Sequence, residues 1–281
     1  MKLHRWAGHL FFACFLFFAA MTAASRIIPH LHAPVPDDPG EDWRPELSRV
    51  RSIDAAMRVL PAYVARETGS REARTAAAVD HFVRDRFVHG TSLLSYHHNW
   101  LAALSGAAWL NLRMPVLPDD ILHHRRAICS QQAIVFMEML KRSGIRYASV
   151  LMGWPGANGE EGHFAVAARV DGRWLYFDPD QEAAQEGAPV ESVVDGSVLP
   201  RLYGDKPELL ARLRYAAAHH RITLAHVDAY PAPRGGLFQR ATEWLSAYGW
   251  LLFGLLSLSQ RLLGSRRARG EARGALAVAA E

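Results

Sequence analysis

The sequence predicts an α+β domain in which a helical N-terminal half is followed by an antiparallel sheet. First, apolar residues recur every three or four positions through much of 47–142, which is the spacing of amphipathic helices. Second, the pattern changes after Gly144, where "IRYASVLMG", "HFAVAARV" and "RWLYFD" have the composition and alternation of strands. Third, Asp171-Gly172 separates the last two segments, and this dipeptide between alternating runs is a strong signal for a hairpin turn.

Three helices are expected before the helix that begins at Cys129. The first follows Leu47 and is interrupted at Pro61, because a proline inside a helix removes a backbone hydrogen bond. The second begins after Ser70, which is a favourable N-cap residue, and ends at Gly90. The third covers 98–112, where tryptophan and leucine residues recur at helical spacing.

A fourth helix runs from Cys129 to about Arg142 and is closed by Gly144. It is apolar around most of its circumference, so we expect it in the core, packed on the sheet. After the strands, 206–220 is expected to be helical and 221–227 to form an edge strand.

Both ends of the chain carry apolar segments. The run "LFFACFLFFAA" at 10–20 follows Lys2 and Arg5, and with its flanks it approaches the length of a bilayer span. We favour an uncleaved anchor over a cleaved signal peptide, and we interpret Cys14 as an apolar filler within it. A second segment, 244–264, has aromatic residues at one end and arginines beyond the other. For it we favour a transmembrane helix over an amphipathic helix of the folded body.

These segments predict the domain order. It is an N-terminal membrane anchor or signal peptide at 1–26, a Pro-rich linker at 27–46, an α+β domain at 47–230, a juxtamembrane linker at 231–243, a probable transmembrane helix at 244–264 and a basic cytoplasmic tail at 265–281. In this topology both ends lie in the cytoplasm and the α+β domain lies outside it.

The distribution of charge argues against nucleic-acid binding. The formal net charge is +4, but 1–26 and 261–281 together hold eight basic and two acidic residues, so the rest of the chain carries about −2. A slightly acidic body with basic ends is typical of membrane topology and not of a phosphate-binding face.

Three residue types that carry out nucleophilic catalysis occur in a consistent order. Cys129 opens the buried helix, where unpaired backbone N–H groups and the helix dipole stabilise a thiolate. On a hairpin that turns at Asp171-Gly172, Val166 faces Phe177, which brings His163 within side-chain reach of Asp178. A carboxylate that orients an imidazole, and an imidazole that takes the thiol proton, are the elements of a catalytic triad.

Each of these residues also has a simpler interpretation. Cys129 alone would be an inert core thiol, His163 a surface residue at a strand start, and Asp178 a turn carboxylate before a proline. Asp180 is a reserve candidate for the role of Asp178. The His-His pairs at 97–98, 123–124 and 219–220 do not have metal-ligand spacing, so we expect no metal and no other cofactor.

The chain from about 78 to 182 resembles the core of the transglutaminase-like superfamily, which has a Cys-His-Asp triad in papain-like order. The matching pieces are "DDILHHRRAICSQQAIVFMEMLKRSGIRYASVLMGW", "EGHFAVAARVDGRWLYFDP" and "AVDHFVRDRFVHG". The resemblance implies a papain-like α+β core with Cys129 as nucleophile, His163 as base and Asp178 as its orienting carboxylate. Among the side chains, Tyr96, Asn99 and Trp100 are candidate oxyanion donors. The backbone N–H of Cys129 is a better candidate.

Two functions are compatible with these observations. The first is a membrane-anchored cysteine enzyme of the bacterial inner membrane, whose domain faces the periplasm or cell exterior. It would act on protein or wall-peptide amides through a thioester, with hydrolysis and acyl transfer both open. The second is a membrane-tethered binding or assembly module that keeps the fold without turnover. Neither interpretation identifies a partner protein.

Overall fold

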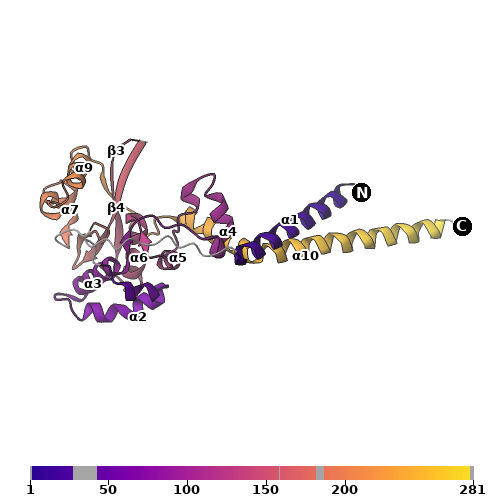
Figure 1. Cartoon of the computed structure of the whole chain (residues 1–281), viewed down its shortest axis with the longest axis horizontal. Coiled ribbons are helices and arrows are strands. Elements are labelled where there is room, and N and C mark those ends of the chain that lie inside the picture. Colours follow the sequence, from indigo (N-terminus) through magenta and orange to yellow (C-terminus); the bar gives the residue numbers. More distant parts are fainter. Residues whose placement is uncertain (1, 28–42, 158, 182–186, 279–281) are drawn as a thin grey trace. The chain divides into compact units, whose positions relative to one another are not determined.

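The computed structural model describes residues 2–27, 43–157, 159–181 and 187–278 (Figure 1). The chain divides into two compact units, one formed by 1–32, 94–113 and 237–281, and the other by 33–93 and 114–236. Most of the linker expected at 27–46 lies outside the described residues. The two units are considered separately below.

The second unit is built on a five-stranded antiparallel sheet with the strand order β6-β5-β4-β3-β7. The predicted hairpin has the expected register, with Val166 opposite Phe177 and Val170 opposite Arg173. Its turn has Asp171 and Gly172 in the left-handed region, at φ 47° and 80°, as a two-residue hairpin loop requires. The strands are β3 (Tyr147–Gly156), β4 (Gly159–Val170), β5 (Arg173–Phe177), β6 (Ala188–Pro189) and β7 (Ile222–Ala225).

Helices cover both faces of this sheet. Alternation along β4 directs Val166 and Ala168 toward the core that contains the cysteine helix, and Ala165 and Ala167 toward a second core. The first layer comprises η1 (Pro45–Arg49), α2 (Ile53–Val64), α3 (Arg71–Arg86), α5 (Pro118–Leu122) and α6 (Cys129–Arg142). The second comprises α7 (Val190–Val194), α8 (Leu199–Leu202) and α9 (Pro207–Ala218). The α+β prediction, with the cysteine helix packed on an antiparallel sheet, is confirmed.

Two helix ends differ from the prediction. Pro61 does not interrupt the first helix: it lies in the last turn of α2, where the proline removes only one hydrogen bond close to the end. The second helix ends at Arg86 rather than Gly90, because Val88–His89 form the short strand β1. This strand pairs in parallel with β2 (Arg126–Ala127), directly before the cysteine helix.

The first unit contains α1 (Lys2–Ile27), α4 (Tyr96–Ser105), η2 (Leu110–Leu112) and α10 (Pro233–Val278). The single helix predicted at 98–112 is therefore wrong. Asn99 breaks the helical conformation at φ −147° and ψ 81°, and its side chain accepts a hydrogen bond from the N–H of Ala102 as an N-cap does. A separate short helix follows at Leu110–Leu112.

Helices α1 and α10 lie side by side within this unit (Figure 1). The ring of Phe18 lies against Gly249, and the hydroxyl of Thr22 donates to the carbonyl of Ser246 at 3.0 Å. Among the described helices, one segment, Trp6–Ile27 in α1, is long and apolar enough to cross a bilayer by length and composition. A signal sequence passes the same test, and 244–264 as a span stays a prediction.

Candidate active site

Cys129 is the first residue of α6, and buried side chains hold this end of the helix in place. Gln131 lies in the first turn and accepts hydrogen bonds from the N–H of Ile128 at 3.1 Å and the hydroxyl of Ser92 at 3.0 Å. Its amide nitrogen donates to the carbonyl of Pro115 at 3.1 Å. The first N–H groups of an α-helix have no partner within the helix, so they surround the half-buried thiol with donors and a positive dipole end.

His163 lies within β4, opposite Met152 of β3. Strands β3 and β4 remain paired beyond His163, out to Gly156 and Gly159. His163 therefore lies inside a strand paired with β3, with strand residues before and after it, instead of standing at a strand start. Its side chain is 5% exposed, and its Nε2 lies 2.8 Å from Oδ2 of Asp178.

Asp178 follows the last residue of β5 and is fully buried. Four groups bond to its carboxylate. Tyr203 donates to Oδ2 at 2.5 Å, Tyr176 approaches the same oxygen at 3.3 Å, and the N–H of Gln181 donates to Oδ1 at 3.3 Å, in addition to the bond with His163. Burial raises the pKa of a carboxyl group, but the charge and hydrogen bond of His163 and the hydrogen bond of Tyr203 outweigh it, and the pKa of Asp178 is lowered.

The same contacts act on the imidazole in the opposite direction. Burial favours neutral His163, but the charge and hydrogen bond of Asp178, followed by the contact with Cys129, raise its pKa well above the ordinary value. Since Asp178 occupies Nε2, Nδ1 is the ring nitrogen that remains for the thiol. A cationic imidazole between a carboxylate and a sulfur is the arrangement that stabilises a thiolate.

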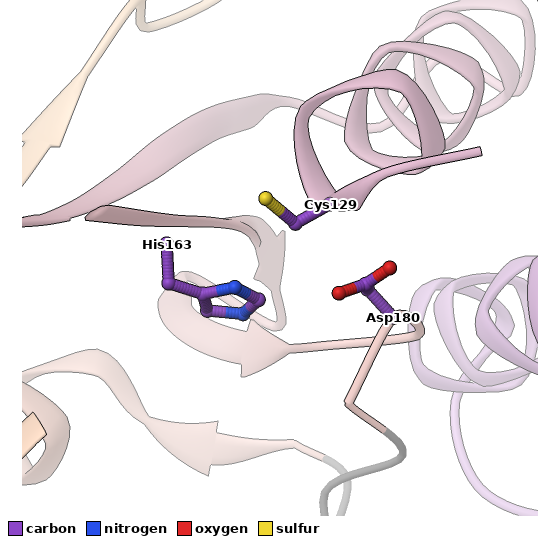
Figure 2. Close-up of side chains that lie close together, drawn as sticks. All are labelled: Cys129, His163 and Asp180. Atoms are coloured by element: carbon purple, nitrogen blue, oxygen red, sulfur yellow. The ribbon is translucent and has the colours of Figure 1, made fainter. Parts of the chain in front are cut away.

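A second carboxylate approaches the thiol. Figure 2 shows Cys129, His163 and Asp180 lying close together, on the start of α6, on β4 and on the loop after β5. The sulfur, a ring nitrogen and a carboxylate oxygen all lie within 4.8 Å of one another. Asp180, the reserve candidate for the orienting carboxylate, thus takes a different place from Asp178, which holds the far side of the imidazole.

Asp180 is itself held by neighbours that the sequence did not indicate. Its Oδ1 lies 2.7 Å from Nδ1 of His89 and 2.8 Å from Nε2 of Gln132, and its side chain is 2% exposed. His89 reaches this position because β1 pairs with β2 immediately before Cys129. No periodicity signals a two-residue strand, so nothing in the pattern of the sequence points to His89.

Two of the three candidate side-chain oxyanion donors, Asn99 and Trp100, have other hydrogen-bond partners. Nδ2 of Asn99 donates to Thr242 Oγ1 at 2.9 Å, and the indole N–H of Trp100 donates to the carbonyl of Ser246 at 3.0 Å, all within the first unit. These donors are therefore already satisfied. The backbone N–H of Cys129 at the helix start stays the preferred candidate.

Comparison with known proteins adds a family match. Residues 63–191 match a family described as "Transglutaminase-like domain". Nothing among the curated proteins matches the chain.

Similar solved structures include a candidate cysteine protease from Cytophaga hutchinsonii, with 16% identity over 53% of this chain and 45% of that one, at a TM-score of 0.31. Another is a TGase, with 12% identity over 56% of this chain and 36% of that one, at a TM-score of 0.30. This chain thus spans less than half the length of either. The matched segment, 63–191, includes Cys129, His163 and Asp178, and over this segment the chain is similar to transglutaminase-like domains.

Proposed function

We propose that the protein is a membrane-anchored cysteine enzyme that acts on amide or peptide bonds through a thioester. The observation that carries the proposal is the spatial arrangement of Asp178, His163 and Cys129, with the imidazole between the carboxylate and the sulfur. Nε2 of His163 lies 2.8 Å from buried Asp178, and a ring nitrogen of the same imidazole lies within 4.8 Å of the sulfur at the start of α6. An inert core thiol needs neither partner.

In the first half of the proposed reaction, the Cys129 thiolate attacks the carbonyl carbon of an amide, and the carbonyl electron pair moves to oxygen. Backbone N–H groups at the start of α6 are placed to stabilise that oxyanion. The C–N bond then breaks, the Nδ1 proton of His163 passes to the departing nitrogen, and a thioester and a free amine result. Asp178 keeps the imidazole oriented and stabilises its charged form.

In the second half, water or an amine attacks the thioester and gives its proton to His163. The carbon–sulfur bond breaks and the thiolate is restored. Water gives hydrolysis, and an amine gives acyl transfer. We propose secreted proteins or wall peptides as the amide substrates. The length and composition of α1 are compatible with a membrane anchor, and the basic residues near both ends of the chain favour a domain outside the cytoplasm.

Electrophile labelling tests the proposal. The sequence contains two cysteines, so a Cys14→Ala background leaves Cys129 as the only thiol. In the full-length chain in detergent, iodoacetamide is expected to label Cys129 rapidly, and His163→Ala to slow labelling at neutral pH by about tenfold or more, because base activation contributes on that scale. Equal labelling rates in the two chains would contradict activation by His163.

Mass spectrometry then separates the two candidate functions. Incubation with activated esters and peptide amides is expected to add an acyl mass to Cys129, and a primary amine is expected to appear in the product only if transfer occurs. A chain that is labelled by iodoacetamide but never acylated would support the alternative, a tethered binding module that keeps the transglutaminase-like fold.

A further inference from the structure

Asp180 is not required by the triad, because Asp178 already orients His163. Its side chain is nevertheless buried beside the thiol, where a second negative charge disfavours a thiolate. Bonds from His89 and Gln132 fix the Asp180 carboxylate in this position. The arrangement places a sulfur, a carboxylate and an imidazole around one point, and a cation bound at that point would compensate the charge of the carboxylate and of a thiolate.

We propose that Cys129, His163 and Asp180 form a three-donor site for Zn²⁺, and that the ion blocks the thiol when it binds. Zinc prefers thiolate, imidazole and carboxylate donors, at about 2.3 Å for sulfur and about 2.0–2.2 Å for nitrogen and oxygen. In a tetrahedron these bonds place donor atoms about 3.4–3.6 Å apart. The three donor atoms already lie within 4.8 Å of one another, so side-chain rotations that move these atoms by about 1 Å bring them to the spacing of a zinc site.

The donor side chains make the outer hydrogen bonds that metal ligands usually make. A metal-binding histidine commonly donates its second ring N–H to a carboxylate, and Nε2 of His163 has Asp178 at 2.8 Å. A ligating carboxylate is likewise held by outer hydrogen bonds, as Asp180 is held by His89 and Gln132. Oδ1 of Asp180 is occupied by His89 and Gln132, and Oδ2 accepts from Nε2 of Gln181 at 2.8 Å. Each carboxylate oxygen has two acceptor positions, so one position on Oδ2 is left for an ion.

The donor set also selects the ion. Magnesium and calcium prefer oxygen ligands, whereas a sulfur, a nitrogen and an oxygen suit zinc. Thiolate, carboxylate and neutral imidazole carry two negative charges in total, which match Zn²⁺. On binding, the ion takes the place of the proton on the sulfur–imidazole pair, and that proton leaves to solvent. Metal binding does not depend on the proposed reaction, but its consequence, inhibition, rests on the proposed function.

Metal titration of the full-length chain in detergent, in the Cys14→Ala background, tests the site. Co²⁺, used as a spectroscopic substitute for Zn²⁺, is expected to give a thiolate-to-metal charge-transfer band that Cys129→Ala abolishes. Zn²⁺ is expected to protect Cys129 from iodoacetamide, while Mg²⁺ and Ca²⁺ at equal concentration are not.

The variant that decides the assignment is Asp180→Asn. Loss of this ligand is expected to raise the Zn²⁺ concentration that gives half-protection by about tenfold or more, since even outer partners of metal ligands contribute on that scale. Asp180→Glu, which keeps a carboxylate, is expected to recover part of the loss. Asp195→Asn, an exposed carboxylate at the end of α7, serves as the matched control and is expected to leave protection unchanged.

The outcomes distinguish failure of the metal site from failure of the proposed enzyme function. Equal half-protection in Asp180→Asn and the parent chain would remove Asp180 from the site, and absence of a charge-transfer band would overturn sulfur ligation. A chain that gives the band and Zn²⁺ protection but is never acylated would keep the metal site and lose the enzyme. If Asp180→Asn does not fold, Asp180→Glu alone decides: Zn²⁺ binding unchanged by the longer side chain would argue against a preformed site.

Discussion

At the scale of single residues, two tyrosines hold the carboxylate of Asp178 in addition to its bond with His163. Tyr203 donates to Oδ2 at 2.5 Å, Tyr176 lies 3.3 Å from the same oxygen, and the two hydroxyls are 2.7 Å apart. Burial, followed by the charge of Asp178, raises the pKa of both hydroxyls well above the ordinary value, so both stay protonated as donors.

Tyr203→Phe is therefore expected to destabilise the fold by about 1–3 kcal/mol, because it leaves a buried charged acceptor short of a donor. It is also expected to slow iodoacetamide labelling of Cys129, since a less firmly held Asp178 orients His163 less well. Denaturant unfolding and labelling rates measure the two effects. Tyr176→Phe is the matched control, with a smaller loss expected from its longer contact; a larger loss in Tyr176→Phe would contradict this assignment.

The sequence predicted the residues that follow from chain order and strand register, and missed those that depend on distant packing. His163 and Asp178 meet because the hairpin register brings them together, and that register could be counted from Asp171-Gly172. Asp178 and Asp180 stand two residues apart after the same strand, so spacing alone could not assign their roles. Tyr203 reaches the site from α8 and its following turn, a segment without sequence periodicity.

At the scale of elements, the start of α6 is held by one polar side chain in the core. Gln131 is 2% exposed and bonds to Ile128, Ser92 and Pro115, so it joins the helix start to two loops. The position of the thiol relative to His163 thus depends on a residue with no chemical role of its own.

Gln131→Ala is expected to cost about 1–3 kcal/mol in the free energy of unfolding, because the partners of a buried hydrogen-bonding group lose their bonds. Lys141→Ala, at the other end of α6, removes a side chain that is 60% exposed and is expected to stay within about 0.5 kcal/mol. Denaturant titration of both variants checks the contrast. Equal losses would mean that Gln131 does not hold the helix start.

Long elements with a clear sequence periodicity were predicted well, and short elements were not. The helix Cys129–Arg142 and the hairpin turn were identified because their patterns extend over many residues. The pair β1–β2 has two residues in each strand, which is too short for any pattern. The small helices of the second layer, at 190–194 and 199–202, are fixed by packing on the far face of the sheet and not by local propensity.

At the scale of the whole molecule, the two terminal helices form a matched pair within the first unit. Glycines of α10 meet aromatic rings of α1: Phe18 packs on Gly249, and Phe15 packs on Gly254. The ring of Phe18 also lies 4.9 Å from that of Phe253, and Thr22 donates to the backbone carbonyl of Ser246. Small residues that let helices approach closely are typical of helix pairs in membranes. That α1 is a retained anchor and not a cleaved signal peptide stays a prediction.

Gly249→Leu tests the importance of that pair, because any side chain at this position collides with the ring of Phe18. The collision is expected to destabilise the pairing of α1 and α10 by about 1–3 kcal/mol, the usual cost of overpacking. Gly264→Leu is the matched control, since it places the same side chain on the same helix at a position with no neighbouring atom within 4 Å. Thermal unfolding in detergent is expected to shift down for Gly249→Leu alone; equal shifts in both variants would mean that α1 does not pack on α10 through this contact.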